Sequence, residues 1–193
     1  MAPVRLEPGD ALIIVDPQVD FFPGGKVPVP EGDEIIGPLN RWIRTARNAE
    51  RPILVTRDWH PANHISFKER GGPWPAHCVQ GSEGAQFHPH LELPPEVEVI
   101  SKGEHPDHEQ YSAFQRPHLA GELWDQGLRR LWVGGLAQDI CVRATVLDAL
   151  EAGFDVFVLK AAMRPVNLQA GDGERALRTM EEAGATIVTD VPD

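Results

Sequence analysis

The stretch Arg130-Leu-Trp-Val-Gly-Gly-Leu-Ala-Gln-Asp-Ile-Cys-Val-Arg-Ala-Thr-Val-Leu-Asp-Ala-Leu150 decides how this chain is expected to fold. Residues 130–134 have the composition of a short buried strand, and residues 135–139 then turn the chain. Residues 140–150 have the pattern of a helix, with Gly153 just beyond its end. A buried strand that passes through a tight turn into a helix is typical of a parallel α/β sheet.

Cys141 falls in the first turn of this expected helix. Unpaired backbone N–H groups and the positive end of the helix dipole lie there, and both favour the thiolate, which is the nucleophilic form of cysteine. The same N–H groups could hold an oxyanion formed by attack on a carbonyl. This arrangement suggests acyl-transfer chemistry. The alternative is that Cys141 is only a small buried hydrophobe, as most free cysteines are.

Five further apolar runs predict strands, and helical patterns lie between them. The expected strands are residues 11–16, 52–57, 97–101, 155–159 and 186–189, and the expected helices are residues 34–50, 118–126 and 172–183. Repeated alternation of apolar strands with helices predicts a three-layer α/β/α fold, in which helices cover both faces of a six-stranded parallel sheet. No linker divides the sequence, so residues 1–193 are expected to form a single domain.

One long segment, residues 59–95, departs from this alternation. It is rich in Pro, Gly, His and Trp and has no clear periodicity. A stretch of this length without regular structure is usually functional or disordered. Four large aromatic residues argue against disorder, so we interpret the segment as an ordered insertion that builds the site.

Composition narrows the possible functions and partners. The formal net charge of −11 argues against a general nucleic-acid-binding protein, which needs a basic face. No apolar run approaches the length of a transmembrane helix, so no membrane association is expected. The N-terminal residues have no secretory pattern and there are only two cysteines, which predicts a cytoplasmic protein with reduced thiols. The sequence does not decide between a monomer and a homo-oligomer.

Chemically useful side chains follow the expected strands. Asp16, Asp58 and Lys102 each stand where an apolar run ends, and Cys141 lies just past another. Ligands of an open parallel sheet bind beyond the carboxyl ends of its strands, so these groups are expected to converge there. One carboxylate, Asp16, could take the proton of the thiol and later deliver a proton to a departing amine. The ammonium of Lys102 would keep both Asp16 and the thiolate charged.

A second signal is the triplet Asp58-Trp59-His60. In an extended strand, the side chains at i and i+2 leave from the same face, so an oxygen and an imidazole would point to one place. His77 in Trp74-Pro-Ala-His77 could complete an open site for a divalent metal. Weaker ligand candidates are His64, Glu69 and Cys78, of which the cysteine is better explained as a packing thiol. The remaining histidines of the polar loops are expected to be solvated: His88, His90, His105 and His108.

Together these motifs resemble the nicotinamidase/pyrazinamidase branch of the isochorismatase-like cysteine hydrolases. The resemblance runs from Ala11 to about Asp190. It is carried by Ala11-Leu-Ile-Ile-Val-Asp-Pro-Gln-Val-Asp-Phe21, Thr56-Arg-Asp-Trp-His-Pro-Ala-Asn-His-Ile-Ser-Phe67, Trp74-Pro-Ala-His-Cys-Val-Gln-Gly81, Lys102-Gly103 with Tyr111-Ser-Ala-Phe114, and Gly134-Gly-Leu-Ala-Gln-Asp-Ile-Cys-Val-Arg-Ala-Thr-Val-Leu-Asp-Ala149. It implies a Rossmann-like six-stranded parallel sheet and hydrolysis of nicotinamide, a small-molecule substrate, to nicotinate and ammonia, with pyrazinamide as a further substrate.

The resemblance also implies roles for individual residues. The implied catalytic triad is Asp16, Lys102 and Cys141, and the implied ligands of the metal are Asp58, His60 and His77. The ion is implied to be Zn²⁺, with Fe²⁺ or Mn²⁺ as alternatives. The side chains implied to enclose the substrate ring are Phe21, Trp74 and Tyr111. The implied oxyanion hole consists of the backbone N–H groups of Ala137 and Cys141, with a cis peptide bond at Leu136–Ala137.

One departure from the family pattern is the Val19-Asp20-Phe21 segment, where many members have Asn before Asp-Phe. We interpret Asp20 as a structural loop residue. A related hydrolase acting on another small amide or on isochorismate remains the alternative function. A nucleotide-binding oxidoreductase is disfavoured because the turn after the first strand is not a glycine-rich phosphate cradle. An intact Asp, Lys and Cys set disfavours a binding domain without catalytic activity.

Overall fold

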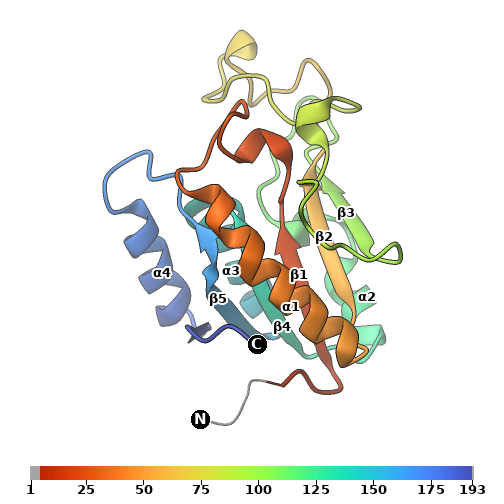
Figure 1. Ribbon diagram of the computed structural model, residues 1–193. Helices are drawn as coiled ribbons and strands as arrows, with labels where there is room; N and C mark the ends of the chain where they lie inside the picture. The colour runs from red at the N-terminus through yellow and green to blue at the C-terminus, as the bar shows by residue number, and fades with distance from the viewer. Residues whose placement is uncertain (1–4, 193) are drawn as a thin grey trace.

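The structure is a computed structural model that describes residues 5–192 of the 193-residue chain, and its centre is a six-stranded sheet (Figure 1). All of the strand pairs are parallel, and the order is β3-β2-β1-β4-β5-β6. The strands are β1 (Asp10–Val15), β2 (Ile53–Asp58), β3 (Glu98–Lys102), β4 (Arg130–Leu136), β5 (Asp155–Arg164) and β6 (Thr186–Val188). The predicted six-stranded parallel sheet is therefore confirmed.

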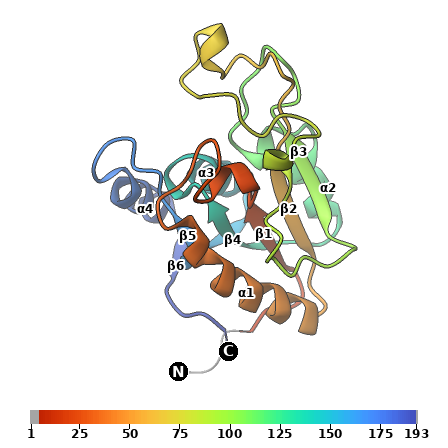
Figure 2. The same ribbon diagram turned by 45° about the horizontal axis from the view of Figure 1, so that its top comes forward.

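In the part of the chain that the structure describes, four α-helices cover the two faces of the sheet unequally. They are α1 (Ile36–Asn48), α2 (Leu119–Asp125), α3 (Arg143–Glu151) and α4 (Asp172–Glu182). α1 packs against one face, and residues of α2, α3 and α4 join the hydrophobic cluster on the other face (Figure 2). Right-handed crossovers explain why the helices divide between the two faces. After β1 the chain moves along the sheet toward β3, and after β4 it moves in the opposite direction toward β6, so the connecting helices fall on opposite faces. The three layers match the prediction.

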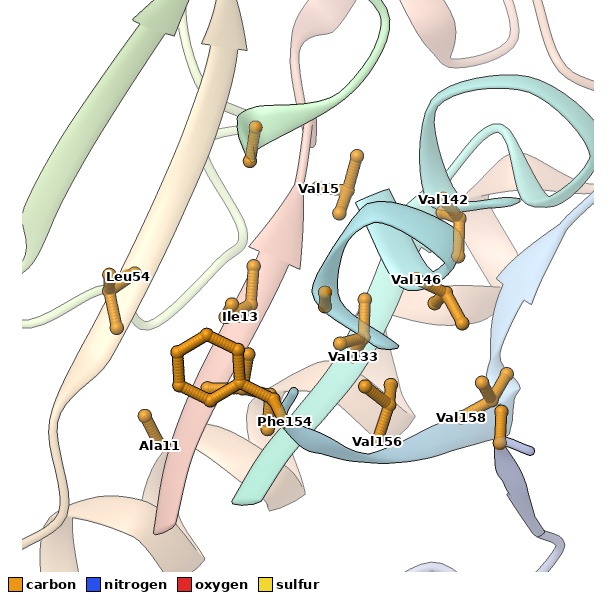
Figure 3. Close-up of a cluster of buried hydrophobic side chains, with 14 of the residues drawn as sticks. Ala11, Ile13, Val15, Leu54, Val133, Val142, Val146, Phe154, Val156 and Val158 are labelled. Atoms are coloured by element: carbon orange, nitrogen blue, oxygen red, sulfur yellow. The ribbon is translucent and has the colours of Figure 1, made fainter. Parts of the chain in front are cut away.

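The hydrophobic pattern of the sequence explains these layers. β1 is buried along its whole length, with Ile13 facing one hydrophobic cluster and Ile14 the other. Figure 3 shows β1 and β4 side chains gathered with Val142 and Val146 in the first of these clusters. On the other face, α1 buries Leu39, Trp42, Ile43 and Ala46, which lie on one stripe of a 3.6-residue helix.

Two elements differ from the sequence prediction. The helical stretch that follows β4 begins with a π-helical turn, Gln138–Val142, in which the Val142 N–H donates to the Ala137 carbonyl five residues back at 3.1 Å. α3 itself begins only at Arg143. β5 continues five residues beyond the expected end, because a shift of register between Val133 and Gly135 lets it pair with β4 as far as Leu136.

The segment between β2 and β3 lies above the carboxyl ends of the strands, where Figure 1 shows it in yellow to yellow-green. Its regular structure comprises two short 3₁₀ helices, Lys68–Arg70 and Glu83–Ala85. Isolated bridges join His60 to Val79 and Gln18 to Phe87. These bridges hold residues 59–95 over the carboxyl ends of β1 and β2. Within residues 5–192, no helix has both the length and the apolar character needed to cross a membrane.

Candidate active site

The three groups of the expected triad meet where the strand order reverses, between β1 and β4. Asp16 follows β1, Lys102 ends β3, and Cys141 lies in the π-helical turn after β4. Lys102 Nζ lies 2.7 Å from Asp16 Oδ2 and 3.5 Å from Cys141 Sγ. A carboxylate oxygen of Asp16 is within 4.8 Å of the same sulfur. All three side chains are buried, so the sheet brings a carboxylate, an ammonium and a thiol into mutual reach away from solvent.

Asp16 is held by a residue of the neighbouring strand. The Thr56 hydroxyl of β2 donates to Asp16 Oδ1 at 2.6 Å and accepts from the Asp16 backbone N–H at 3.0 Å. Both residues are fully buried, and Asp16 has a φ of 45°, in the left-handed region. The two bonds leave Oδ2 of Asp16 facing the ammonium of Lys102.

Lys102 also links this cluster to Asp58. Its ammonium donates to Asp58 Oδ1, so one lysine contacts both carboxylates and the thiol. Gln18 fixes the backbone of Asp58, since its Oε1 accepts from the Asp58 N–H at 2.8 Å and its Nε2 donates to the Asp58 carbonyl at 2.7 Å. Asp58 Oδ2 stays free to face the histidines, and the two predicted sites therefore share Lys102.

Asp58, His60 and His77 form a cluster suited to a metal ion. Their ligand atoms all lie within 4.8 Å of one another, and all three residues are buried. His60 Nδ1 lies 3.1 Å from the His77 carbonyl and His77 Nδ1 lies 2.8 Å from the Pro75 carbonyl. Carbonyl oxygens only accept, so each Nδ1 carries the proton and each Nε2 presents a lone pair.

The orientation of these nitrogens provides a test of whether a metal fits. Both Nε2 atoms face Asp58 Oδ2, at 4.0 Å from His60 and 3.9 Å from His77. His60 Nε2 is buried and has no hydrogen-bond partner within residues 5–192, which is costly for a polar atom unless an ion completes it. Burial and the neighbouring His77 lower the pKa of His60 to about 3, so the ring stays neutral and able to ligate. One carboxylate and two imidazoles are ligands that Zn²⁺ accepts.

Burial changes the proton affinities of the three triad groups. It raises the pKa of Asp16, although Lys102 opposes the shift and Asp58 adds to it. Burial alone would lower the pKa of Lys102, but the Asp16 and Asp58 carboxylates raise it well above its usual value. Burial also raises the pKa of the Cys141 thiol, against the effect of Lys102. Burial therefore opposes the thiolate that the helical turn is expected to favour.

An aromatic pocket opens onto the sulfur. Its walls include Phe21, Val27, Val29, Asp58, Trp74, His77, Tyr111, Ala137, Ile140, Cys141 and Val166. The Trp74 Nε1–H donates to the Tyr111 hydroxyl at 3.4 Å, and the ring of Phe21 meets that of His77 edge-on at 5.6 Å. The pocket is narrow, with a volume of about 30 Å³. A larger hollow of about 880 Å³ lies between α1 and the start of β3, and the described residues that line it include no thiol or histidine.

The turn that carries Cys141 is shaped by a close approach of β1 and β4. A Cβ on Gly135, whose φ is +122°, would lie 2.1 Å from the Val15 carbonyl oxygen, so only glycine fits there. The Leu136–Ala137 peptide bond that follows is cis, as the family resemblance implies. Ala137 and Cys141 both line the pocket, and their N–H groups remain the proposed oxyanion hole.

The other candidates from the sequence lie outside the metal cluster. Glu69 is exposed on its 3₁₀ helix, and Cys78 is a buried free thiol whose pKa is raised by burial. Both ring nitrogens of His64 are engaged, by the Ser66 hydroxyl at 2.7 Å and the His108 carbonyl at 3.0 Å. The polar-loop histidines His90, His105 and His108 are exposed and His88 is half-buried. Asp20 accepts backbone N–H bonds from Cys78 and Lys26, which fits its interpretation as a structural residue.

Sequence reasoning missed three residues of the site. Gln18 and Thr56 hold the backbone of Asp58 and the carboxylate of Asp16, and both act across strands, 40 residues away in the chain. Glu109 lies on the loop after β3, near His60 and His64. Burial and the Asp58 carboxylate raise its pKa to about 7. A polar residue beside an apolar run was the only signal for Gln18 and Thr56, and Glu109 had none.

The fold and the site together define a cysteine-dependent hydrolase of the α/β class. The chain belongs to the isochorismatase family, because the model of the isochorismatase domain matches residues 10–190. A nicotinamidase of Escherichia coli (strain K12) is 41% identical over 203 residues, which cover 94% of this chain and 95% of the relative.

Solved structures agree with this assignment. A pyrazinamidase of Pyrococcus horikoshii in complex with zinc has a TM-score of 0.90 and 49% identity, with 95% of this chain and 100% of that chain covered. A protein of L. infantum in complex with nicotinate has a TM-score of 0.87 and 38% identity, with 97% of this chain and 96% of that chain covered.

Proposed function

We propose that this protein is a nicotinamidase, which hydrolyses nicotinamide to nicotinate and ammonia through a thioester on Cys141. The observation that carries the proposal is the contact of Lys102 with both Asp16 and Cys141 at the mouth of an aromatic pocket. Nicotinamidase activity in relatives that match nearly the whole chain supports it. The product of this reaction feeds the salvage of pyridine nucleotides.

The first half of the reaction forms the thioester. Asp16 accepts the thiol proton of Cys141 as the sulfur attacks the carboxamide carbon, and a C–S bond forms. The backbone N–H groups of Ala137 and Cys141 hold the resulting oxyanion. Asp16 then returns the proton to the amide nitrogen, the C–N bond breaks, and ammonia leaves. A raised pKa suits Asp16 to both transfers, because it binds the proton more tightly than an ordinary aspartate does.

The second half releases the product. Asp16 is again unprotonated after ammonia leaves, and it takes a proton from a water molecule that attacks the thioester carbon. The C–S bond breaks and the proton on Asp16 returns to the Cys141 sulfur. The nicotinic acid formed loses its remaining proton to solvent and leaves as nicotinate. Throughout both halves, the Lys102 ammonium balances the charge of the buried carboxylates, which would otherwise repel the developing thiolate.

In this proposal, aromatic side chains of the pocket would enclose the substrate ring, and the neighbouring cluster of one carboxylate and two histidines would hold the metal. Phe21, Trp74 and Tyr111 enclose the pyridine ring with apolar surface. Asp58, His60 and His77 hold a divalent ion, for which zinc is the proposed identity, given the ligand set and the zinc complex of the P. horikoshii pyrazinamidase. When bound, the ion supplies a fixed positive charge that orients a polar substrate.

One assay tests the function directly. Purified protein is incubated with nicotinamide, and nicotinate and ammonia are quantified separately, before and after treatment with a chelator and after zinc is restored. The proposal predicts equal amounts of both products, loss of activity with the chelator, and recovery with zinc. A matched panel containing pyrazinamide and isochorismate tests the range: pyrazinamide should be hydrolysed. Turnover of isochorismate but not of nicotinamide would overturn the proposal.

The proposed compartment is the cytoplasm, where Cys78 and Cys141 would both stay reduced.

A further inference from the structure

Glu109 lies beside the metal cluster, and the proposed reaction does not use it. One of its carboxylate oxygens lies within 4.8 Å of ring nitrogens of both His60 and His64. The side chain is half-buried, on the loop between β3 and the 3₁₀ helix Ala113–Gln115. This second cluster shares His60 with the set formed by Asp58, His60 and His77. A carboxylate therefore approaches the metal cluster from a separate loop.

The loop is built to hold Glu109 in this place. Gly103 begins it with a φ of +66°, and a Cβ there would lie 2.7 Å from His60 Nε2, so the backbone rests directly on the imidazole. The Gly103 N–H donates to Gln110 Oε1 at 2.9 Å, which closes the loop back on itself. The residue next to Gln110 is thereby kept near the histidines. The position of Glu109 follows from this closure of the loop.

Glu109 approaches a buried nitrogen, His60 Nε2, that has no hydrogen-bond partner among residues 5–192. His60 Nε2 is buried and presents a lone pair, and no donor in the described part of the chain reaches it. His64 cannot complete it, because its Nδ1 faces the Ser66 hydroxyl and its Nε2 faces the His108 carbonyl. A divalent cation held here satisfies the nitrogen.

We propose that Glu109 is a fourth protein group of the metal site, and that its carboxylate accepts a hydrogen bond from a water ligand of the ion. Glu109 lies within 4.8 Å of a ring nitrogen of His60, but it does not lie within that distance of the ligand atoms of both Asp58 and His77. This larger separation agrees with a contact to the ion through a water molecule. Two direct ligands at about 2.1 Å from one ion can be no more than about 4.2 Å apart. Outer carboxylates of this kind orient the ligands and strengthen the binding of the metal. The proposal rests on the proposed function only in assuming the same ion.

The test measures zinc affinity in the absence of substrate. The full-length protein, stripped of metal, competes with a chromogenic chelator for zinc as wild type, Glu109→Gln and Glu69→Gln. The Glu69→Gln variant is the matched control, since it makes the same chemical change on an exposed side chain of the adjoining segment. Glu109→Gln should raise the Kd for zinc by roughly 10- to 100-fold. Glu69→Gln should leave it unchanged.

A further variant separates a metal-positioning role from a structural one. Glu109→Asp keeps the carboxylate and should recover part of the lost affinity, while all variants should unfold at the same temperature without metal. Wild-type affinity in Glu109→Gln, or equal losses in both glutamine variants, would overturn the proposal. Loss of affinity as predicted, in a protein that forms no nicotinate, would refute the amidase function and leave the role of Glu109 standing.

Discussion

Replacing Thr56 with valine should weaken both the fold and the acid–base group of the site. The hydroxyl of Thr56 makes two buried hydrogen bonds to Asp16, one to the carboxylate at 2.6 Å and one from the backbone N–H at 3.0 Å. Valine has a similar shape but fills the place of the hydroxyl with a methyl group. The Asp16 N–H then has lost its acceptor, and one carboxylate oxygen has lost its donor.

The magnitude follows from the kinds of bond that are lost. A hydrogen bond to a charged group contributes about 2 kcal/mol, and stranding a buried N–H costs about 1 kcal/mol or more. The sum is about 3 kcal/mol, which in a domain of this size lowers the Tm by roughly 6–12 °C. Because the bond from Thr56 lowers the pKa of Asp16, its loss should also move the acid limb of the kcat/KM profile to higher pH.

Thermal unfolding and a pH–rate profile check both effects, with Thr56→Ser as the matched control. Serine keeps the hydroxyl, so it should retain the position of the acid limb and lose only the small contribution of a buried methyl group, about 1 kcal/mol. The reasoning is refuted if Thr56→Val unfolds within about 2 °C of wild type. An unmoved acid limb in that variant would show that Asp16 is not the group that titrates.

Four further results are expected. His60→Ala should reduce the zinc content measured by elemental analysis, because one of three ligands is lost; full occupancy would contradict the ligand set. Gly103→Ala should weaken zinc binding and lower the free energy of unfolding by about 1–2 kcal/mol, since a Cβ at a φ of +66° would meet His60; equal zinc affinity would argue against that contact. Trp74→Ala should raise KM for nicotinamide more than it lowers kcat, and the reverse pattern would remove Trp74 from the binding wall. Because burial raises the pKa of Asp16, kcat/KM should begin to fall with decreasing pH above the ordinary aspartate pKa of about 4. A profile flat to that pH would count against Asp16 as the base.

The strand pattern made much of the site predictable. Parallel strands place their carboxyl ends on one edge, so Asp16, Lys102 and Cys141 could be expected to converge once their strands were recognised. The structure brings them together, with Lys102 reaching from the edge strand β3 to Asp16. The periodicity of α1 was equally clear, since four buried residues share one stripe.

Other features depended on information that a pattern does not contain. The bonds from Thr56 and Gln18 require the register between β1 and β2, which the sequence does not specify. The extension of β5 depends on a shift of register opposite Gly135. The thiol of Cys141 is a further case, because the favourable effect of the helical turn was foreseeable and the degree of burial was not.

The account is tested most directly by comparing the two cysteines of the chain under the same substitution. Both are buried, and only Cys141 contacts Lys102. Ammonia release from nicotinamide should disappear in Cys141→Ala, which should still bind zinc, and should persist in Cys78→Ala. Turnover by Cys141→Ala at a rate near that of the wild-type protein would show that the sulfur of Cys141 is not the nucleophile.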